Sequence, residues 1–298
     1  MGYLSQTLKL LLKNNHERKL SGSFLSIGRQ SVAIENHRLF DLIQKYGFEK
    51  DEVKSRLKND ELTRNAHQYS DDSLLQSLFP EIRYSSLDRS DYEGAEIIQD
   101  MNFPIIGDKK KYDLIYNGSC MDNLFNPYQF LVNCSTLLEP NGRIFHVEAA
   151  GTFRGAFLMY SPEYFLSFYA INNYKKCEVY FLVTHDGTSR YNLYCDWFKY
   201  SPYFDRNSPQ DTDLEACRSI WGTTYVLVIA EKGRNSTDDK IPTQLHYMDQ
   251  NCADWRKNFD KWPVVETSQL HLQHREIPNL PYNSNHYTYI GSELKGVT

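Results

Sequence analysis

FLSIGRQ, residues 24–30, is an apolar run that ends at a lone glycine, Gly28. A second apolar run, IRYSSLD at residues 82–88, follows about 60 residues later and ends at an acid, Asp88. A glycine at the end of a strand lets a ligand approach the backbone. A carboxylate at the end of the next strand can accept hydrogen bonds from both hydroxyls of a ribose. Together the two runs predict a site for a nucleoside cofactor.

Composition and charge are those of a globular protein with one substantial core. The chain has 298 residues, of which 41% are hydrophobic and 14% aromatic, and its formal net charge is -5. An acidic balance disfavours a broad nucleic-acid-binding surface. Apolar runs such as residues 8–12 are far shorter than the roughly 18 residues of a membrane helix, and no secretory leader precedes them. We therefore expect a cytoplasmic protein without nucleic-acid or membrane partners.

The spacing of cysteine and histidine predicts no metal site. The six cysteines lie at wide and irregular intervals, with no CxxC motif and no histidine at metal-ligand spacing. We expect them to be reduced and mostly buried thiols. They are Cys120, Cys134, Cys177, Cys195, Cys217 and Cys252.

Short β-prone runs, alternating with helical patterns, outline an α/β sheet. Helices are predicted at residues 127–138 and from Ser161 onward, where a serine, a proline and an acid form a typical helix start. Strands that alternate with helices favour a mostly parallel sheet covered on both faces. Beyond the two runs above, the predicted strands are residues 95–101, 112–117, 143–149, 177–184 and 224–230.

Three further segments surround this pattern. Leucines at helical spacing in residues 4–13 predict a helix that packs against the sheet edge. Residues 35–80 carry two or three helical patterns, which indicates a crossover enlarged by a helical insertion after the first strand. The composition becomes polar after residue 232, so we expect an α/β domain at residues 1–232 and an extension at residues 233–298. The extension is expected to wrap the domain or to meet a partner, including a second copy of the chain in a homo-oligomer.

These segments resemble the class I S-adenosylmethionine-dependent methyltransferase fold from about residue 24 to residue 232. SLDRSDYEGAEIIQDMN at residues 86–102 and YDLIYNGSCMDNLFN at residues 112–126 are similar to a bacterial methyltransferase-like family. That family shows an LGRQ turn, an SLDxSDYEGA segment, a DLN after the third strand and a DGGTLEHVFN segment after the fourth. The fold that the resemblance implies is Rossmann-like, with a seven-stranded, mostly parallel sheet and helices on both faces.

The same resemblance implies S-adenosylmethionine as the cofactor and assigns the first strand ends to it. Gly28, Arg29 and Gln30 would line its methionine part, although the GxGxG of most methyltransferases is reduced here to one glycine. Asp88 would bind the ribose hydroxyls.

The later strand ends would complete the cofactor site. Asp100 and Met101 would flank the adenine, with a carboxylate for the exocyclic amine and a thioether against the ring. The pocket beside the sulfonium would be closed by Asn117, Gly118 and Ser119.

Two residues are candidates for a catalytic role. Asp122 is the acid placed to orient or deprotonate a hydroxyl, because Asn123 stands where the family has a histidine and an amide takes no proton near neutral pH. His146 is a second candidate base, although it lies inside a predicted strand, where a hydrogen-bonded core histidine is more common. His185 is a weaker one. The aromatic residues that follow were interpreted as core or lid packing, or as a surface for sugar stacking: Tyr191, Tyr194, Trp197, Phe198, Tyr200, Tyr203 and Phe204.

Three functions compete on this evidence. The leading hypothesis is a methyltransferase that acts at oxygen on a small molecule or a glycan precursor, as in polysaccharide biosynthesis, which the resemblance implies. The alternative is a degenerate member that keeps the fold and serves as a binding or scaffold subunit. A nicotinamide-dependent enzyme is disfavoured, because no GxGxxG follows the first strand and no Tyr-xxx-Lys pair is seen in a suitable helix.

Overall fold

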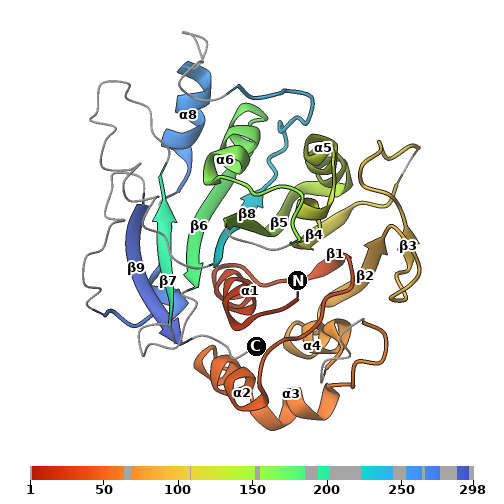
Figure 1. Ribbon diagram of the computed structural model, residues 1–298, viewed down its shortest axis with the longest axis vertical. Helices are drawn as coiled ribbons and strands as arrows, with labels where there is room; N and C mark the ends of the chain where they lie inside the picture. Colours follow the sequence, from red (N-terminus) through yellow and green to blue (C-terminus); the bar gives the residue numbers. More distant parts are fainter. Residues whose placement is uncertain are drawn as a thin grey trace.

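The computed structural model describes residues 2–63, 69–107, 109–151, 155–184, 194–201, 223–243, 253–263, 266–275 and 287–294. These residues form one nine-stranded mixed sheet, in the order β3-β2-β1-β4-β5-β8-β6-β7-β9 (Figure 1). The strands are β1 (Gly22–Ile27), β2 (Ile82–Asp88), β3 (Ile97–Ile98), β4 (Tyr112–Gly118), β5 (Leu138–Gly151), β6 (Lys176–Thr184), β7 (Tyr194–Tyr200), β8 (Thr223–Glu231) and β9 (Tyr287–Leu294). The helices are α1 (Ser5–Glu17), α2 (Asn36–Lys45), α3 (Lys50–Arg56), α4 (Asp71–Leu78), α5 (Pro127–Leu137), α6 (Pro162–Ile171) and α8 (Ala253–Lys261), with short 3₁₀ turns η1 (Met121–Asn123) and η5 (Ser268–Leu270).

The first five strands have the doubly wound order with a switch point between β1 and β4. Strand β1 pairs in parallel with β2 on one side and with β4 on the other. In this register Ile27 lies opposite both Leu87 and Asn117, so that the three strands end at the same level. In open α/β sheets ligands bind in the crevice beyond such carboxyl ends, at the switch point.

The α/β fold and the mostly parallel sheet are confirmed, and the sheet has two strands more than the seven expected. By their pairings β7 and β8 run against the other strands, and β7 and β9 extend the sheet beyond β6. Strand β7 is built from the aromatic stretch interpreted as core or lid packing. Trp197 and Phe198 lie on its opposite faces, and both are buried. The other cluster members Tyr191, Tyr203 and Phe204, and also His185, lie outside the described residues.

Helices cover both faces of the sheet. Both faces carry apolar side chains, because successive side chains of a strand point to opposite faces. Phe24 and Leu114 belong to the core beneath α1, α2 and α4. Their neighbours Leu25 and Ile115 belong to the opposite core, beneath α5 and α6. The two layers of helices are seen on either side of the sheet in Figure 1.

Helix α1 lies on a face of the sheet and not at its edge, as had been expected. Leu8 and Leu11 are fully buried in the core, and the helix is covered further by α2 and by η5 from the extension. Even Lys9 and Lys13 are buried, and each is paired with a carboxylate. The edge position was wrong because β7 and β9 continue the sheet past this helix.

The extension contributes to the same sheet. Strand β9 pairs with β7, and Arg275 forms an ion pair of 2.7 Å with the buried Asp196 of β7. Helix α8 contacts α6, and Trp262 Nε1 donates a hydrogen bond of 2.8 Å to the carbonyl of Tyr174. Within the part of the chain that is described, no helix is both long and apolar enough to span a bilayer.

Candidate functional site

A cleft of about 290 Å³ opens at the carboxyl ends of β1, β2 and β4, at the switch point. Its floor and walls combine apolar side chains with a few polar groups, the usual make-up of a small-molecule site. It is lined by Ile27, Gly28, Leu87, Asp88, Arg89, Gln99, Met101, Cys120, Asn123, Leu124 and Phe130.

Gly28 forms the turn that follows β1. Its φ of +75° favours glycine, and a Cβ at this position would lie 2.8 Å from the Sγ of Cys120. The turn is held by its own hydrogen bonds: the backbone N–H of Gly28 donates to the carbonyl of Leu87 at 2.7 Å, and Ser26 Oγ donates to the carbonyl of Gly28 at 2.7 Å. Glycine is therefore required here by the positive φ and by the close approach of Cys120, and the turn has a fixed position in the lining of the cleft.

Asp88 stands across the cleft from this turn. Its Oδ1 accepts a hydrogen bond of 2.5 Å from the backbone N–H of Arg89, which fixes the carboxylate. Its Oδ2 lies 3.8 Å from the place that a Cβ of Gly28 would occupy. The glycine and the acid that the sequence singled out thus face one another in one cleft.

The segment after β3 supplies Met101 and Gln99, but not Asp100. Met101 is buried and lines the cleft, and its carbonyl accepts a hydrogen bond of 3.1 Å from Asn133 Nδ2. Asp100 is occupied by its own loop: its Oδ1 accepts from the backbone and side chain of Asn102, at 2.9 and 3.0 Å, and its Oδ2 lies 3.5 Å from Arg89 Nε. The carboxylate expected at the adenine therefore shapes the turn, and Gln99 is the polar side chain that lines the cleft there.

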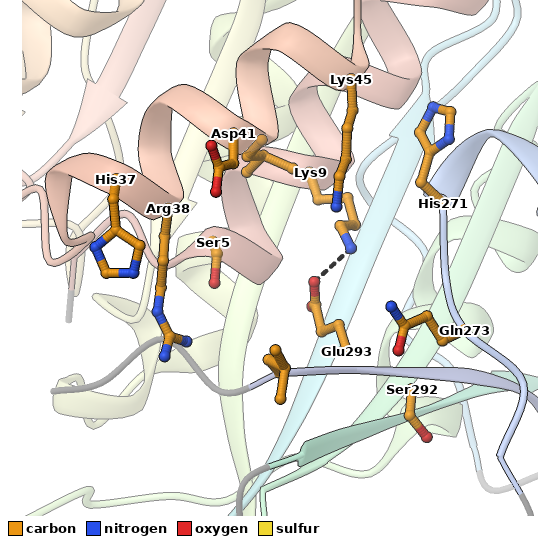
Figure 2. A pocket seen from close by; sticks show the side chains of 12 residues that line it. Ser5, Lys9, His37, Arg38, Asp41, Lys45, His271, Gln273, Ser292 and Glu293 are labelled. Atoms are coloured by element: carbon orange, nitrogen blue, oxygen red, sulfur yellow. Dashed lines mark ion pairs between the residues drawn. The ribbon is translucent and has the colours of Figure 1, made fainter.

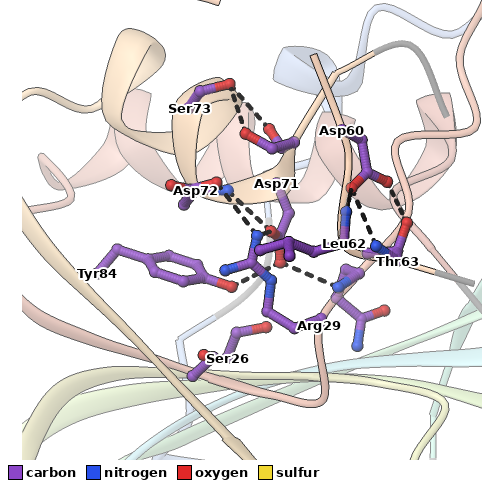
Figure 3. Close-up of polar contacts among 12 residues, drawn as sticks. Ser26, Arg29, Asp60, Leu62, Thr63, Asp71, Asp72, Ser73 and Tyr84 are labelled. Atoms are coloured by element: carbon purple, nitrogen blue, oxygen red, sulfur yellow. Dashed lines mark hydrogen bonds and ion pairs between the residues drawn. The ribbon is translucent and has the colours of Figure 1, made fainter. Parts of the chain in front are cut away.

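Arg29 does not line the cleft, and its guanidinium points toward Asp71 and Asp72 of the helical insertion (Figure 3). Its guanidinium lies 2.8 Å from Asp71, which is fully buried at the start of α4. Asp71 also accepts hydrogen bonds from Tyr84 Oη at 2.5 Å and from the backbone N–H of Gln30 at 2.9 Å. Burial raises the pKa of Asp71, and the Arg29 charge opposes that rise. This cluster fastens α4 to the turn that presents Gly28.

Gln30 lies behind the same turn. Its Nε2 donates to the carbonyl of Ile27 at 3.1 Å, whereas its buried Oε1 has no hydrogen-bond partner in the structure. A Cβ at Gly118 would lie 2.3 Å from that Oε1, so the end of β4 passes directly against the Gln30 amide. Neither residue lines the cleft.

His146 is a core residue in this structure. It is fully buried on β5, and its ring nitrogens lie 3.0 Å from Asn117 Nδ2 and 2.5 Å from Tyr169 Oη. Burial lowers the pKa of His146 to about 3, so the ring is neutral. Asn117 is equally buried, and neither side chain reaches the cleft.

Glu148, which the sequence analysis did not single out, organises the loop after β4. Its buried carboxylate accepts hydrogen bonds from Asn117 Nδ2 at 2.6 Å and from the backbone N–H groups of Met121 at 3.2 Å and Asp122 at 3.1 Å. Burial raises its pKa well above the ordinary value. Three donors converge on this one group, so it sets the course of η1.

Asp122 lies inside that loop and does not line the cleft. It is 2% exposed, its Oδ2 accepts from Ser119 Oγ at 2.6 Å, and its Oδ1 accepts from Asn123 Nδ2 at 2.7 Å. Burial raises the pKa of Asp122. Ser119, with a φ of +65°, is likewise occupied within the loop, and Asn123 is the side chain that reaches the cleft.

Of the predicted site residues, the cleft thus brings together Gly28, Asp88 and Met101, and places the others behind it. Cys120, at the end of β4, could have been found from its place after a strand. Burial raises the pKa of its thiol to about 12. The remaining lining residues had no sequence signal of their own, because their side chains reach the cleft only through packing; they are Ile27, Leu87, Arg89, Gln99, Leu124 and Phe130.

A second cavity, of about 260 Å³, lies between α1, α2 and β9 (Figure 2). Its lining mixes cations with the carboxylates of Asp41 and Glu293, and the Lys9 ammonium at its base pairs with Glu293. Arg38 also pairs with Glu35 at 3.3 Å, outside the lining. The charge of Lys9 is thus neutralised by Glu293, and the cavity lies away from the switch point. Among the described residues, no group of three or more His, Cys, Asp or Glu is arranged to hold a metal ion.

Comparison with known proteins gives distant structural likenesses only. No family model and no curated protein matches the sequence. A SAM-dependent methyltransferase from Archaeoglobus fulgidus is similar in structure at 12% identity and a TM-score of 0.38, over 76% of this chain and 94% of that one. An O-methyltransferase of a Brevibacillus brevis trans-AT polyketide synthase, solved with S-adenosyl-L-homocysteine, has 12% identity and a TM-score of 0.40, over 89% and 86%. The StiE O-methyltransferase has 11% identity and a TM-score of 0.41, over 86% and 80%.

Proposed function

We propose that this protein is an S-adenosylmethionine-dependent methyltransferase whose cofactor binds in the cleft at the switch point. The observation that carries the proposal is the pairing of Gly28 and Asp88 across one cleft, at the aligned ends of adjacent parallel strands. Asp88 Oδ1 accepts from the backbone N–H of Arg89, whereas Asp88 Oδ2 lies 3.8 Å from the Cβ position of Gly28. A ribose bound in the cleft beside both residues would donate its hydroxyls to this carboxylate.

The residues present fit the nucleoside part of this cofactor. The cleft of about 290 Å³ is just below the range of about 300–1,000 Å³ that is typical of ligand sites. Asp88 would accept from the ribose hydroxyls, and Met101 and Leu124 would pack against the adenine. Gly28 and Cys120 both line the cleft and would contact the cofactor from the ends of β1 and β4.

When bound, the cofactor would supply a methyl group on a sulfonium, a leaving group that needs no activation by the protein. The acceptor oxygen would form the new bond to carbon while the bond to sulfur breaks, its electron pair stays on sulfur, and the hydroxyl proton passes to solvent. The protein's part is to align the two reactants, which for well-oriented cases lowers a barrier by about 7–11 kcal/mol. Asn123 faces the cleft and cannot take the proton, and Asp122 would act by orienting the Asn123 amide.

Calorimetric titration with S-adenosylhomocysteine tests the proposal. We expect micromolar binding to the unaltered protein and binding at least tenfold weaker to Asp88→Ala, because the ribose loses a charged acceptor. Asp91→Ala is the matched control: this acid is exposed three residues further on and does not line the cleft, so its removal should leave the affinity unchanged. Absence of heat with the unaltered protein would refute the proposal.

The acceptor was expected to be a small molecule or a glycan precursor, methylated at oxygen in the cytoplasm. We keep oxygen as the proposed acceptor atom because the resemblance implies it; the described lining of the cleft offers no histidine to take the proton, so the acceptor hydroxyl would have to lose its proton to solvent. The choice between the two acceptor classes depends on what borders the cleft.

A further inference from the structure

Three phenylalanines stand out into solvent beside the cleft. Phe103, Phe125 and Phe157 are 64%, 84% and 70% exposed, and we call them the aromatic lip. The rings of Phe125 and Phe157 pack edge to face, with centroids 6.4 Å apart and an angle of 87° between their planes. Single exposed apolar side chains are ordinary, but a group of large rings at one place indicates a binding surface.

The aromatic lip is continuous with the cleft. Phe125 follows Asn123 and Leu124, which line it. Phe103 lies two residues after Met101, another lining residue, and the Asn102 carboxamide between them accepts a hydrogen bond of 3.0 Å from the backbone N–H of Phe125. The lip therefore borders the cofactor cleft on the side of β3 and β4.

The backbone that carries the lip is fixed. The N–H groups of Phe157 and Leu158 donate to the carbonyl of Asp122 at 2.8 and 3.3 Å, and the N–H of Tyr160 donates to the carbonyl of Ala149 at 2.8 Å. Tyr160 Oη also donates to the carbonyl of Met121 at 3.0 Å. The rings are thus held in water by an ordered chain. Contact with an apolar ligand would remove them from water at little further cost in conformational freedom.

The polar side chains around the lip are occupied by the protein itself. Asn102 Oδ1 accepts from two backbone N–H groups, and Asn126 Oδ1 caps α5 by accepting from Gln129 at 3.2 Å. Asn123 Nδ2 donates to the carbonyl of Ser119 at 2.9 Å and to Asp122 at 2.7 Å. A sugar needs hydrogen-bonding groups for its hydroxyls as well as a ring to stack on. These contacts favour an apolar acceptor over a glycan.

We propose that the aromatic lip binds the flat apolar body of the methyl acceptor, an aromatic alcohol of the phenol or naphthol class. The edge-to-face pair leaves a ring face free for offset stacking, and the acceptor hydroxyl would then point past Asn123 into the cleft. This inference rests on the proposed methyltransferase function, because the lip is assigned through the cleft that it borders.

Ligand-observed NMR with 2-naphthol, with methyl β-glucopyranoside as the contrasting probe, tests the inference. We expect saturation transfer to 2-naphthol and little to the glucoside. The double variant Phe125→Ser/Phe157→Ser should weaken naphthol binding on the order of tenfold, because two exposed rings are removed and no buried contact is lost. Leu294→Ser, which alters an apolar side chain 52% exposed on the far edge strand, is the matched control and should bind as the unaltered protein does.

Two further measurements on the same samples distinguish failure of the acceptor assignment from failure of the proposed methyltransferase function. S-adenosylhomocysteine should bind the double variant as it binds the unaltered protein; if neither binds it, the proposed function fails. If both bind it while 2-naphthol binding is absent or unchanged by the double substitution, the acceptor assignment alone is overturned. Flotation with phosphatidylcholine vesicles gives the remaining alternative: vesicle binding that the double substitution abolishes would make the lip a membrane contact and would also overturn the assignment.

Discussion

The neutral, buried His146 makes a quantitative prediction about stability and pH. Burial lowers its pKa from 6.5 to about 3 in the folded protein. Between these values only the unfolded chain takes up the proton, so the stabilising contribution is present above pH 6.5 and is lost as the pH falls toward 3. A pH of 5 lies 1.5 units below the pKa of histidine in the unfolded chain. At 1.36 kcal/mol per unit, this corresponds to a loss of about 2 kcal/mol in the free energy of unfolding.

The assay is urea unfolding at pH 7 and pH 5 of the unaltered protein and of His146→Gln, which keeps a polar group and removes the proton site. We expect the unaltered protein to lose about 2 kcal/mol more free energy of unfolding between the two pH values than the variant does. Glu148, whose pKa burial raises, acts in the opposite direction in both proteins and cancels in the comparison. His16→Gln, at an exposed histidine, is the control and should follow the unaltered protein. Equal losses in the unaltered protein and His146→Gln would refute the reasoning.

Three further predictions concern the framework of the cleft, each measured by urea unfolding with a second readout. Gly28→Ala and Gly47→Ala each place a methyl group at positive φ, which costs about 1–2 kcal/mol in the free energy of unfolding. Only the methyl group of Gly28→Ala also meets neighbouring atoms, so only this variant should abolish S-adenosylhomocysteine binding. Equal effects of the two substitutions would contradict the close approach of Cys120 to Gly28. Asp71→Asn should cost about 3 kcal/mol by leaving Arg29 with a weaker partner, and Arg29→Met in the same chain should recover part of that loss; strict additivity would show that the pair is not coupled. Glu148→Ala should cost about 3 kcal/mol and speed amide hydrogen exchange in η1, whereas unchanged exchange there would remove its role in the loop.

The sequence was sufficient to predict β1, β2 and β4 and the places of Gly28 and Asp88 at strand ends, whereas the strand expected at residues 95–101 is reduced to Ile97–Ile98. Strand β2 begins and ends where its apolar run does, at Ile82 and Asp88, and β1 ends one residue before Gly28. These features are local: periodicity marks the strand, and a glycine or an acid marks its end.

The rest of the site depends on contacts that periodicity does not carry. Arg29 follows Gly28 in the chain but turns away to Asp71, about 40 residues later, because a buried carboxylate needs a cation. Asp100 and Asp122 follow their strands as predicted, and in the structure each accepts hydrogen bonds from its own loop. Only the three-dimensional partner of a polar side chain distinguishes these two uses.

Strand β9 has a consequence for how the chain is made. Residues 1–232 emerge from the ribosome before Tyr287–Leu294 does. Until this segment emerges, β7 lacks its partner strand β9. The ion pairs of Lys9 with Glu293 and of Asp196 with Arg275 likewise form only after their later partners have been synthesised. A nascent chain stalled before this segment would therefore carry an open, aggregation-prone strand.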